Sequence, residues 1–275
     1  VALARRGDRW PVGRTISFAI GISLLDYATS GGLGLYSHFS FQYHMIAHMV
    51  LSMIAPIAII LSAPITLALR TLPIGRDKSE RGIRGMLIQT LHSRPSRVIT
   101  HPVSALAIFD GSLFALYFTP LFSNLMSGHF GHLIMNFHFI AAGLLFFHVI
   151  VGIDPNPRKV HHLVRVVILL AAMSIHAFFS IALMSANELI DGGFYQLLDR
   201  PWATDLLSDQ KAGAAIGWAM GEIPIVIALV ATFIQWVRSD AREAKRADRR
   251  SNTDLAEYNA YLEQLSRKNN SAQDK

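Results

Sequence analysis

The sequence predicts an all-α polytopic transmembrane helix bundle of about six spans, with both termini in the cytoplasm and a charged C-terminal helical tail. Of its 275 residues, 52% are hydrophobic and only 16% are charged, whereas soluble domains carry about 25% charged residues. Apolar runs long enough to cross a hydrocarbon core of ~30 Å recur along the chain. Basic residues gather in alternate gaps between these runs, as they do in membrane proteins with a fixed orientation.

Six apolar runs are the predicted spans. In chain order they cover 15–33, 41–69, 103–122, 128–152, 163–187 and 212–237. Their lengths approach or exceed the ~20 apolar residues that a helix needs to cross a bilayer. The second run is the longest and contains Pro56 and Pro64. Because proline removes a helical hydrogen bond, we expect this span to kink or tilt.

Two further helices are predicted outside the membrane. Residues 82–92 form an amphipathic pattern on the side where basic residues gather. In the charged tail, Asp254 is followed three residues later by Glu257, which is typical of a helix start. We therefore divide the chain into a transmembrane helical bundle at 1–237 and a cytoplasmic charged helical tail at 238–275. The first residue is Val rather than Met, which suggests a trimmed start or a missing upstream segment, and we expect no cleavable signal peptide.

The loops between the spans predict the orientation. Of the 25 Lys and Arg residues, 23 lie in 1–14, 70–101, 153–165 and 238–275. Segments 34–40 and 121–127 carry no charge, and 188–211 is mostly acidic. The positive-inside rule therefore places both termini in the cytoplasm. The net charge of +6 is explained by this topology and by attraction to anionic lipid, so we expect the lipid bilayer and no nucleic acid as a partner.

Histidines gather at the outer ends of two predicted spans. In the second span His44 and His48 lie one helical turn apart, and the fourth span, which also enters from outside, begins with two more. Ionisable side chains within spans usually mark function, and imidazole with thioether suits soft, singly charged copper. The chain has no Cys, which excludes a thiolate site. We therefore predict a Cu(I) site on the extracytoplasmic side with the ligands His44, His48, His129, His132, Met45 and Met49.

Four other polar residues within predicted spans are second-line candidates: His138, His176, Asp110 and Glu222. His138 points to nearly the opposite face of its helix from the one shared by His129, His132 and Asn136. A lone histidine in a span is about as often an interhelical hydrogen-bond partner as a ligand. The two acids are equally compatible with a structural and a proton-linked role.

These residues resemble those of a known family, the CtaG-type cytochrome c oxidase assembly factors of Gram-positive bacteria and their relatives. The matching segments are 44–49 with its continuation to Ala63-Pro64, 132–139, 152–158 and 174–179. The resemblance covers residues 38–190 well and the sixth span loosely, and the tail is not part of it. It implies a multi-pass protein of the cell (plasma) membrane that is not an enzyme and whose partners are cytochrome c oxidase subunits. It also implies a role in oxidase maturation, such as delivering copper to the copper–haem centre.

Three alternatives to a copper-handling assembly factor are open at this point. A membrane cytochrome needs facing histidines at matched depth for haem, and His138, His148 and His176 form no obvious matched set. A metal-free accessory subunit or scaffold of the respiratory oxidase would use the tail and the acidic outer loop as docking surfaces. A proton-driven transporter would use Asp110 and Glu222, although we find none of the internal repeats that such folds usually contain.

Overall fold

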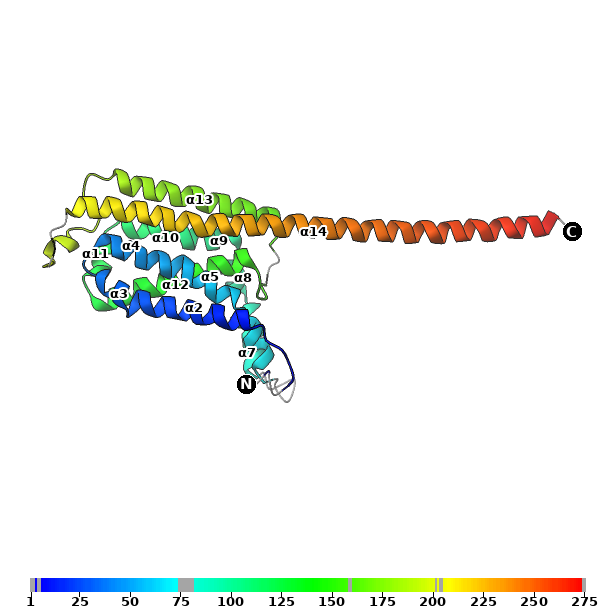
Figure 1. Ribbon diagram of the computed structural model, residues 1–275, viewed down its shortest axis with the longest axis horizontal. Coiled ribbons are helices and arrows are strands. Elements are labelled where there is room, and N and C mark those ends of the chain that lie inside the picture. Colours follow the sequence, from blue (N-terminus) through cyan, green and yellow to red (C-terminus); the bar gives the residue numbers. More distant parts are fainter. Residues whose placement is uncertain are drawn as a thin grey trace. The chain divides into compact units, whose positions relative to one another are not determined.

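In the computed structural model, the described residues are 3, 6–73, 82–157, 160–200, 202 and 205–273, without the side chains of 129, 254 and 264–273. Within these ranges the chain forms helices and no strand (Figure 1). The chain divides into two compact units, Val1–Val230 and Ala231–Lys275. The all-α prediction is therefore confirmed for the part of the chain that the structure describes.

The described helical elements follow one another in chain order. The first ten are α2 (Val12–Thr29), α3 (Gly32–Tyr36), α4 (Phe41–Met49), η1 (Val50–Ile54), α5 (Ala55–Leu61), α6 (Pro64–Thr71), α7 (Ile83–Leu91), α8 (Arg94–Ile99), α9 (Pro102–Leu106) and η2 (Ala107–Gly111). The remaining ones are α10 (Ser112–Tyr117), α11 (Leu121–Met126), α12 (His129–Val151), α13 (His162–Ser185), η3 (Phe194–Leu197) and α14 (Leu206–Gln273). The segments η1 and η2 are π-helical, and η3 is a 3-10 helix. Helix α7 confirms the helix predicted over 82–92.

Among the described residues, five helical stretches are long and apolar enough to cross a membrane by length and composition. They are Val12–Tyr36, Phe41–Leu61, Phe130–Val151, His162–Ser185 and Leu206–Glu263. The third predicted span, 103–122, corresponds to a shorter apolar helix, Pro102–Tyr117. Pro120 explains this early end, because proline disfavours helical backbone at the residue before it. The count of six spans and the orientation of the termini stay predictions.

The second predicted span ends earlier than expected. After α5, Ala63 adopts a left-handed backbone with φ 54°, and Pro64 begins α6 as a separate helix. The prediction that this span continues to residue 69 is therefore wrong. The disturbance expected at Pro56 is present as the π-helical segment η1, which lies directly before α5. Proline cannot donate the backbone hydrogen bond that a regular α-helix requires at that point.

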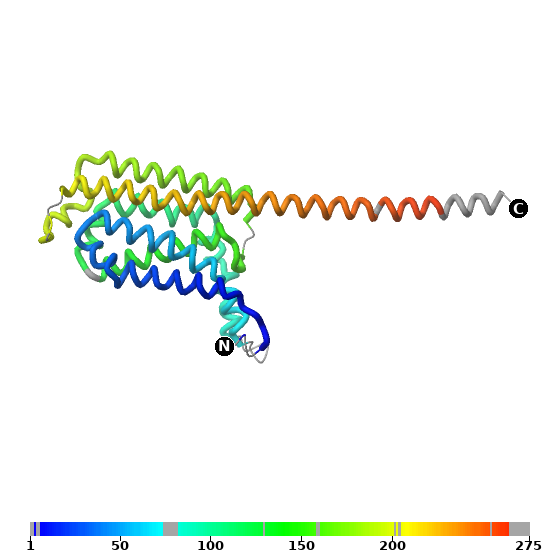
Figure 2. The backbone as a smooth tube through the Cα atoms, viewed as in Figure 1, coloured from blue at the N-terminus to red at the C-terminus, as the bar shows by residue number. Residues whose placement is uncertain are grey.

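Helix α12 packs closely against η1 and α5, and α5 also contacts α2 (Figures 1 and 2). A glycine permits this approach. A Cβ atom at Gly143 of α12 would meet the Ser52 carbonyl and would lie 2.8 Å from Pro56 Cγ. Large buried side chains such as Phe146 and Phe147 fill the surrounding core. Because α4 is continuous with η1, this contact also sets the distance between α4 and α12.

Helix α14 runs without a break past the predicted helix start in the tail. Residues on both sides of Asp254 are helical, and Thr253 Oγ1 donates to the Arg249 carbonyl within the helix at 2.9 Å. The prediction of a helix start at Asp254 is therefore wrong, because a polar residue that bonds back to its own helix does not interrupt it.

Candidate metal centre

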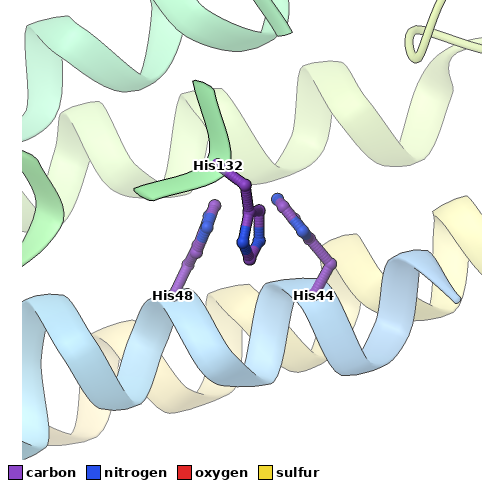
Figure 3. A group of neighbouring side chains, drawn as sticks. All are labelled: His44, His48 and His132. Carbon is purple, nitrogen blue, oxygen red and sulfur yellow. The ribbon is translucent and has the colours of Figure 1, made fainter. Parts of the chain in front are cut away.

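Three of the predicted ligands meet where α4 and α12 face each other. His44 and His48 lie one turn apart on α4, and His132 lies in the first turn of α12. One possible ligand atom from each lies within 4.8 Å of the others, and Figure 3 shows the three rings turned toward one another. The side chains of His44, His48 and His132 are 0%, 0% and 9% exposed. We call this group the histidine triad.

The start of α4 is held by a carboxylate of α14. The Phe41 backbone N–H donates to Asp209 Oδ2 at 2.7 Å, and Ser40 Oγ donates to Asp209 Oδ1 at 2.8 Å. The first N–H groups of a helix have no partner within the helix, so an outside acceptor satisfies one of them. Hydrogen bonds to an ionised group are also stronger than neutral ones. The first turn of α4, and with it His44, is therefore fixed in place.

A buried tyrosine orients the second ring of the triad. His48 Nδ1 and Tyr117 Oη are 2.8 Å apart, and both side chains are buried. When His48 Nδ1–H donates to the tyrosine oxygen, Nε2 carries no proton and is available as a ligand. Such hydrogen bonds behind a ligand select its tautomer and its ring orientation. The amide nitrogen Nδ2 of Asn136, which is a donor, lies 3.5 Å from His132 Nδ1, so this contact differs from the one that Tyr117 can make with His48.

Several nitrogen atoms of the triad have no hydrogen bond. Within the described residues, both ring nitrogens of His44 and the Nε2 atom of His48 are buried and have no partner with full hydrogen-bond geometry, although the Ser37 backbone lies near His44. A buried polar group without a partner costs about 1–3 kcal/mol. Such groups are rare in native structures, where they often indicate a functional role or a bound species. The triad therefore offers lone pairs that a bound cation would satisfy.

The walls around the triad are aromatic. The ring centroids of Phe122 and His44 are 5.1 Å apart, and those of Phe139 and His48 are 4.0 Å apart. The group of residues that can hold a metal contains no carboxylate within the described part of the chain. Neutral imidazoles in an apolar pocket leave the charge of a bound ion uncompensated, which favours a single over a double positive charge.

Three predicted ligands, His129, Met45 and Met49, are not part of the triad. The side chain of His129 is outside the described residues. Met45 packs against α14, since a Cβ atom at Gly217 would lie 2.7 Å from Met45 Cγ. Met49 is buried in the core, with an exposed fraction of 1%. Ligation by Met45 and Met49 stays a prediction.

Three of the four second-line residues, Asp110, His176 and Glu222, lie near one another and apart from the triad. Asp110 in η2 faces His176 of α13, with Oδ1 3.7 Å from Nδ1. His176 Nε2 lies 3.3 Å from the Gly217 carbonyl. Glu222 is partly exposed and accepts a hydrogen bond from Trp218 Nε1 at 3.2 Å. None of these residues, nor His138, belongs to the triad as the described residues define it.

Two residues next to the triad were not predicted. Tyr117 lies 69 positions from His48, so no local pattern connects them. His38 precedes α4, and its ring centroid is 4.3 Å from that of His132. In the sequence, only the position of His38 in an uncharged loop beside the second span indicated that it could lie near the triad.

Comparisons with known proteins identify a family and relatives of this chain. A family model described as cytochrome c oxidase caa3 assembly factor (Caa3_CtaG) matches residues 1–239. An uncharacterized protein of Mycobacterium bovis is 41% identical over 271 residues, which are 97% of this chain and 41% of the relative. An uncharacterized protein of Mycobacterium leprae is 40% identical over 272 residues, again 97% of this chain and 41% of the relative. The chain thus spans less than half the length of these relatives, and no solved structure gives a significant match.

Proposed function

The chain belongs to the cytochrome c oxidase caa3 assembly factor family, and from this premise we propose that it handles Cu(I) for the maturation of a respiratory oxidase. The ion is cargo, held by His44, His48 and His132 and then passed to an oxidase subunit at the copper–haem centre. The protein acts in the cell membrane and is not an enzyme. The observation that carries this proposal is the buried triad, in which three ring nitrogens lack hydrogen-bond partners among the described residues.

The donor set fits a soft, singly charged cation. Imidazole nitrogen binds copper well, and the thioethers of Met45 and Met49, which stay predicted ligands, would favour its reduced state. Three neutral ligands in an aromatic pocket tolerate one positive charge better than two. Structural zinc sites, by contrast, are almost always closed by four ligands, often including thiolate. The triad therefore suits Cu(I) better than a structural zinc ion.

Release is as important as binding for a delivery protein. Neutral ligands hold an ion without the strong Coulomb attraction of thiolates or carboxylates. On the predicted orientation, the triad lies near the outer membrane face, close to the end of the bundle where α4 begins. A partner subunit that offers its own ligands at this end of the bundle can therefore take the ion while the bundle stays folded.

Packing favours a bare ion over haem. The ring centroids of His44 and His48 are 3.9 Å apart, and Phe122 and Phe139 lie directly against them. A porphyrin between facing histidines needs an open slot between helices, and these aromatic rings occupy the space beside the triad. The haem alternative is thereby disfavoured.

Metal analysis of the purified protein tests the proposal. The wild-type chain, loaded anaerobically with Cu(I), is expected to retain about one ion per chain, because its ligands are preformed and neutral. The His44→Ala/His48→Ala variant should retain none, and a host strain that carries it should assemble oxidase with less copper. The matched control is His92→Ala/His101→Ala, which removes two histidines from the opposite predicted side and should leave both readouts unchanged. Equal copper content in the His44/His48 variant and the wild type, or a haem absorption band retained through purification, would contradict the proposal.

A further inference from the structure

A fourth histidine lies beside the triad. His38 is in the segment between α3 and α4, and its side chain is partly exposed. Its ring centroid is 4.3 Å from that of His132, with an angle of 49° between the ring planes. His38 is not one of the three mutually close ligands. It therefore extends the triad toward the surface and does not complete it.

His38 lies at the exposed end of a group of four imidazoles, and the three mutually close rings of the triad lie together at its buried end; we call this arrangement the histidine row. Successive ring centroids are 4.3 Å apart from His38 to His132, 5.9 Å from His132 to His44, and 3.9 Å from His44 to His48. Exposure falls along the same row, from the partly exposed His38 to the fully buried His44 and His48. A cation moving along this row stays next to a nitrogen ligand while it leaves water.

The backbone around His38 is held by the segment that precedes α14. Tyr195 Oη donates to the Ser37 carbonyl at 3.2 Å, and Arg200 Nη1 donates to the Phe39 carbonyl at 3.4 Å. Burial raises the pKa of Tyr195 well above its ordinary value, so its hydroxyl stays neutral and donates. The residues on both sides of His38 are thus fixed by contacts from a distant part of the chain.

We propose that His38 is the receiving ligand of the site, which binds the soft cation at the protein surface and passes it to His132. This inference rests on the proposed function. The transfer is a ligand exchange: a bond from the metal to a His132 nitrogen forms while the bond to His38 is still present, and the bond to His38 then breaks. Cu(I) is stable with two or three ligands: the carrier that delivers the ion supplies the second donor while His38 holds it, and His44 and His48 complete the coordination after His38 leaves. No electron is transferred, and no proton moves when both imidazoles are neutral.

Rapid-mixing kinetics test this role. The full-length purified protein is mixed anaerobically with Cu(I) held by a coloured chelator, and the loss of chelator colour gives the rate and the extent of loading. In His38→Ala, we expect the same final copper content and a loading rate reduced at least about tenfold, which corresponds to ~1.4 kcal/mol in the barrier. His38→Met should load at nearly the wild-type rate, because thioether also binds Cu(I). His92→Ala, which removes an exposed histidine far along the chain, is the matched control and should load normally.

The outcomes separate this inference from the proposed function. An unchanged loading rate in His38→Ala would overturn the role of His38 while leaving the triad intact. A complete loss of copper from folded His38→Ala would also overturn it, since His38 would then be a core ligand. A wild-type chain that binds no Cu(I) would instead overturn the proposed function itself. Circular dichroism of each variant shows that its helices are formed.

Discussion

Replacing Tyr117 by Phe is a sharp test of how the triad is organised. The variant removes a single oxygen atom, which lies 2.8 Å from His48 Nδ1 in a fully buried setting. For His48 Nε2 to bind a metal, the proton of the neutral ring must lie on Nδ1, where the tyrosine oxygen can accept it. In Tyr117→Phe that proton has no acceptor, so a neutral His48 either keeps an unpaired buried N–H or moves the proton to Nε2, where it blocks ligation.

The two possible positions of the His48 proton determine how much stability and how much Cu(I) affinity the variant loses. An unpaired buried donor costs about 1–3 kcal/mol of stability. Loss of a hydrogen bond behind a metal ligand typically lowers metal affinity by about 10–100-fold. At ~1.4 kcal/mol for each factor of ten, this is about 1.4–2.8 kcal/mol of binding free energy. We therefore expect Tyr117→Phe to fold, to melt at a lower temperature, and to bind Cu(I) at least about tenfold more weakly.

Competition against a chelator of known Cu(I) affinity measures the binding constant. The matched control is Tyr43→Phe, because Tyr43 also lies on the α4 helix but is 42% exposed. It should bind Cu(I) as the wild type does. If Tyr117→Phe lost thermal stability but kept the wild-type affinity, Tyr117 would only support the fold, and the proposed tautomer control of His48 would be refuted.

Two further predictions concern how the helices place the triad. Gly143→Ala puts a methyl group against the Ser52 carbonyl, and we expect an overpacking cost of about 1–3 kcal/mol. This cost should appear as a lower melting temperature and weaker Cu(I) binding. The control Gly13→Ala, at a site with no neighbouring atom within 4 Å, should change neither the melting temperature nor the Cu(I) binding. Asp209→Ala removes the acceptor at the start of α4, with an expected cost of about 0.5–2 kcal/mol by the same thermal measurement. Asp240→Ala, at an exposed position of α14, should cost less. A melting temperature equal to that of the wild type in Gly143→Ala or Asp209→Ala would contradict the contacts described above.

The sequence was sufficient for the features that depend on local spacing. Long apolar runs located the major helices, and the four-residue spacing of His44 and His48 placed both rings on one face of a helix. Because the second and fourth spans were predicted to enter from the same side of the membrane, His132 was included in the same predicted site. These inferences succeeded because hydrophobic length and helical periodicity are properties of a single segment.

The remaining features depend on contacts between distant segments. The break after α5 requires Ala63 in a left-handed conformation, which a non-glycine residue adopts only when its surroundings hold it there. Tyr117 and His48 are 69 positions apart and meet only in the folded bundle. The place of His38 depends on hydrogen bonds from Tyr195 and Arg200 to its neighbours. The predicted helix start in the tail was wrong because the residues of a capping pattern are also compatible with a continuous exposed helix.

The central claim is that imidazoles from α4 and α12 hold a soft cation together. The most direct measurement is the X-ray absorption spectrum of the Cu(I)-loaded protein at the copper edge. The triad predicts a low-coordinate Cu(I) ion bound mainly by imidazole nitrogen, with scattering from the rings that weakens in His132→Ala. A spectrum dominated by sulfur, or one identical in the wild type and His132→Ala, would contradict the claim.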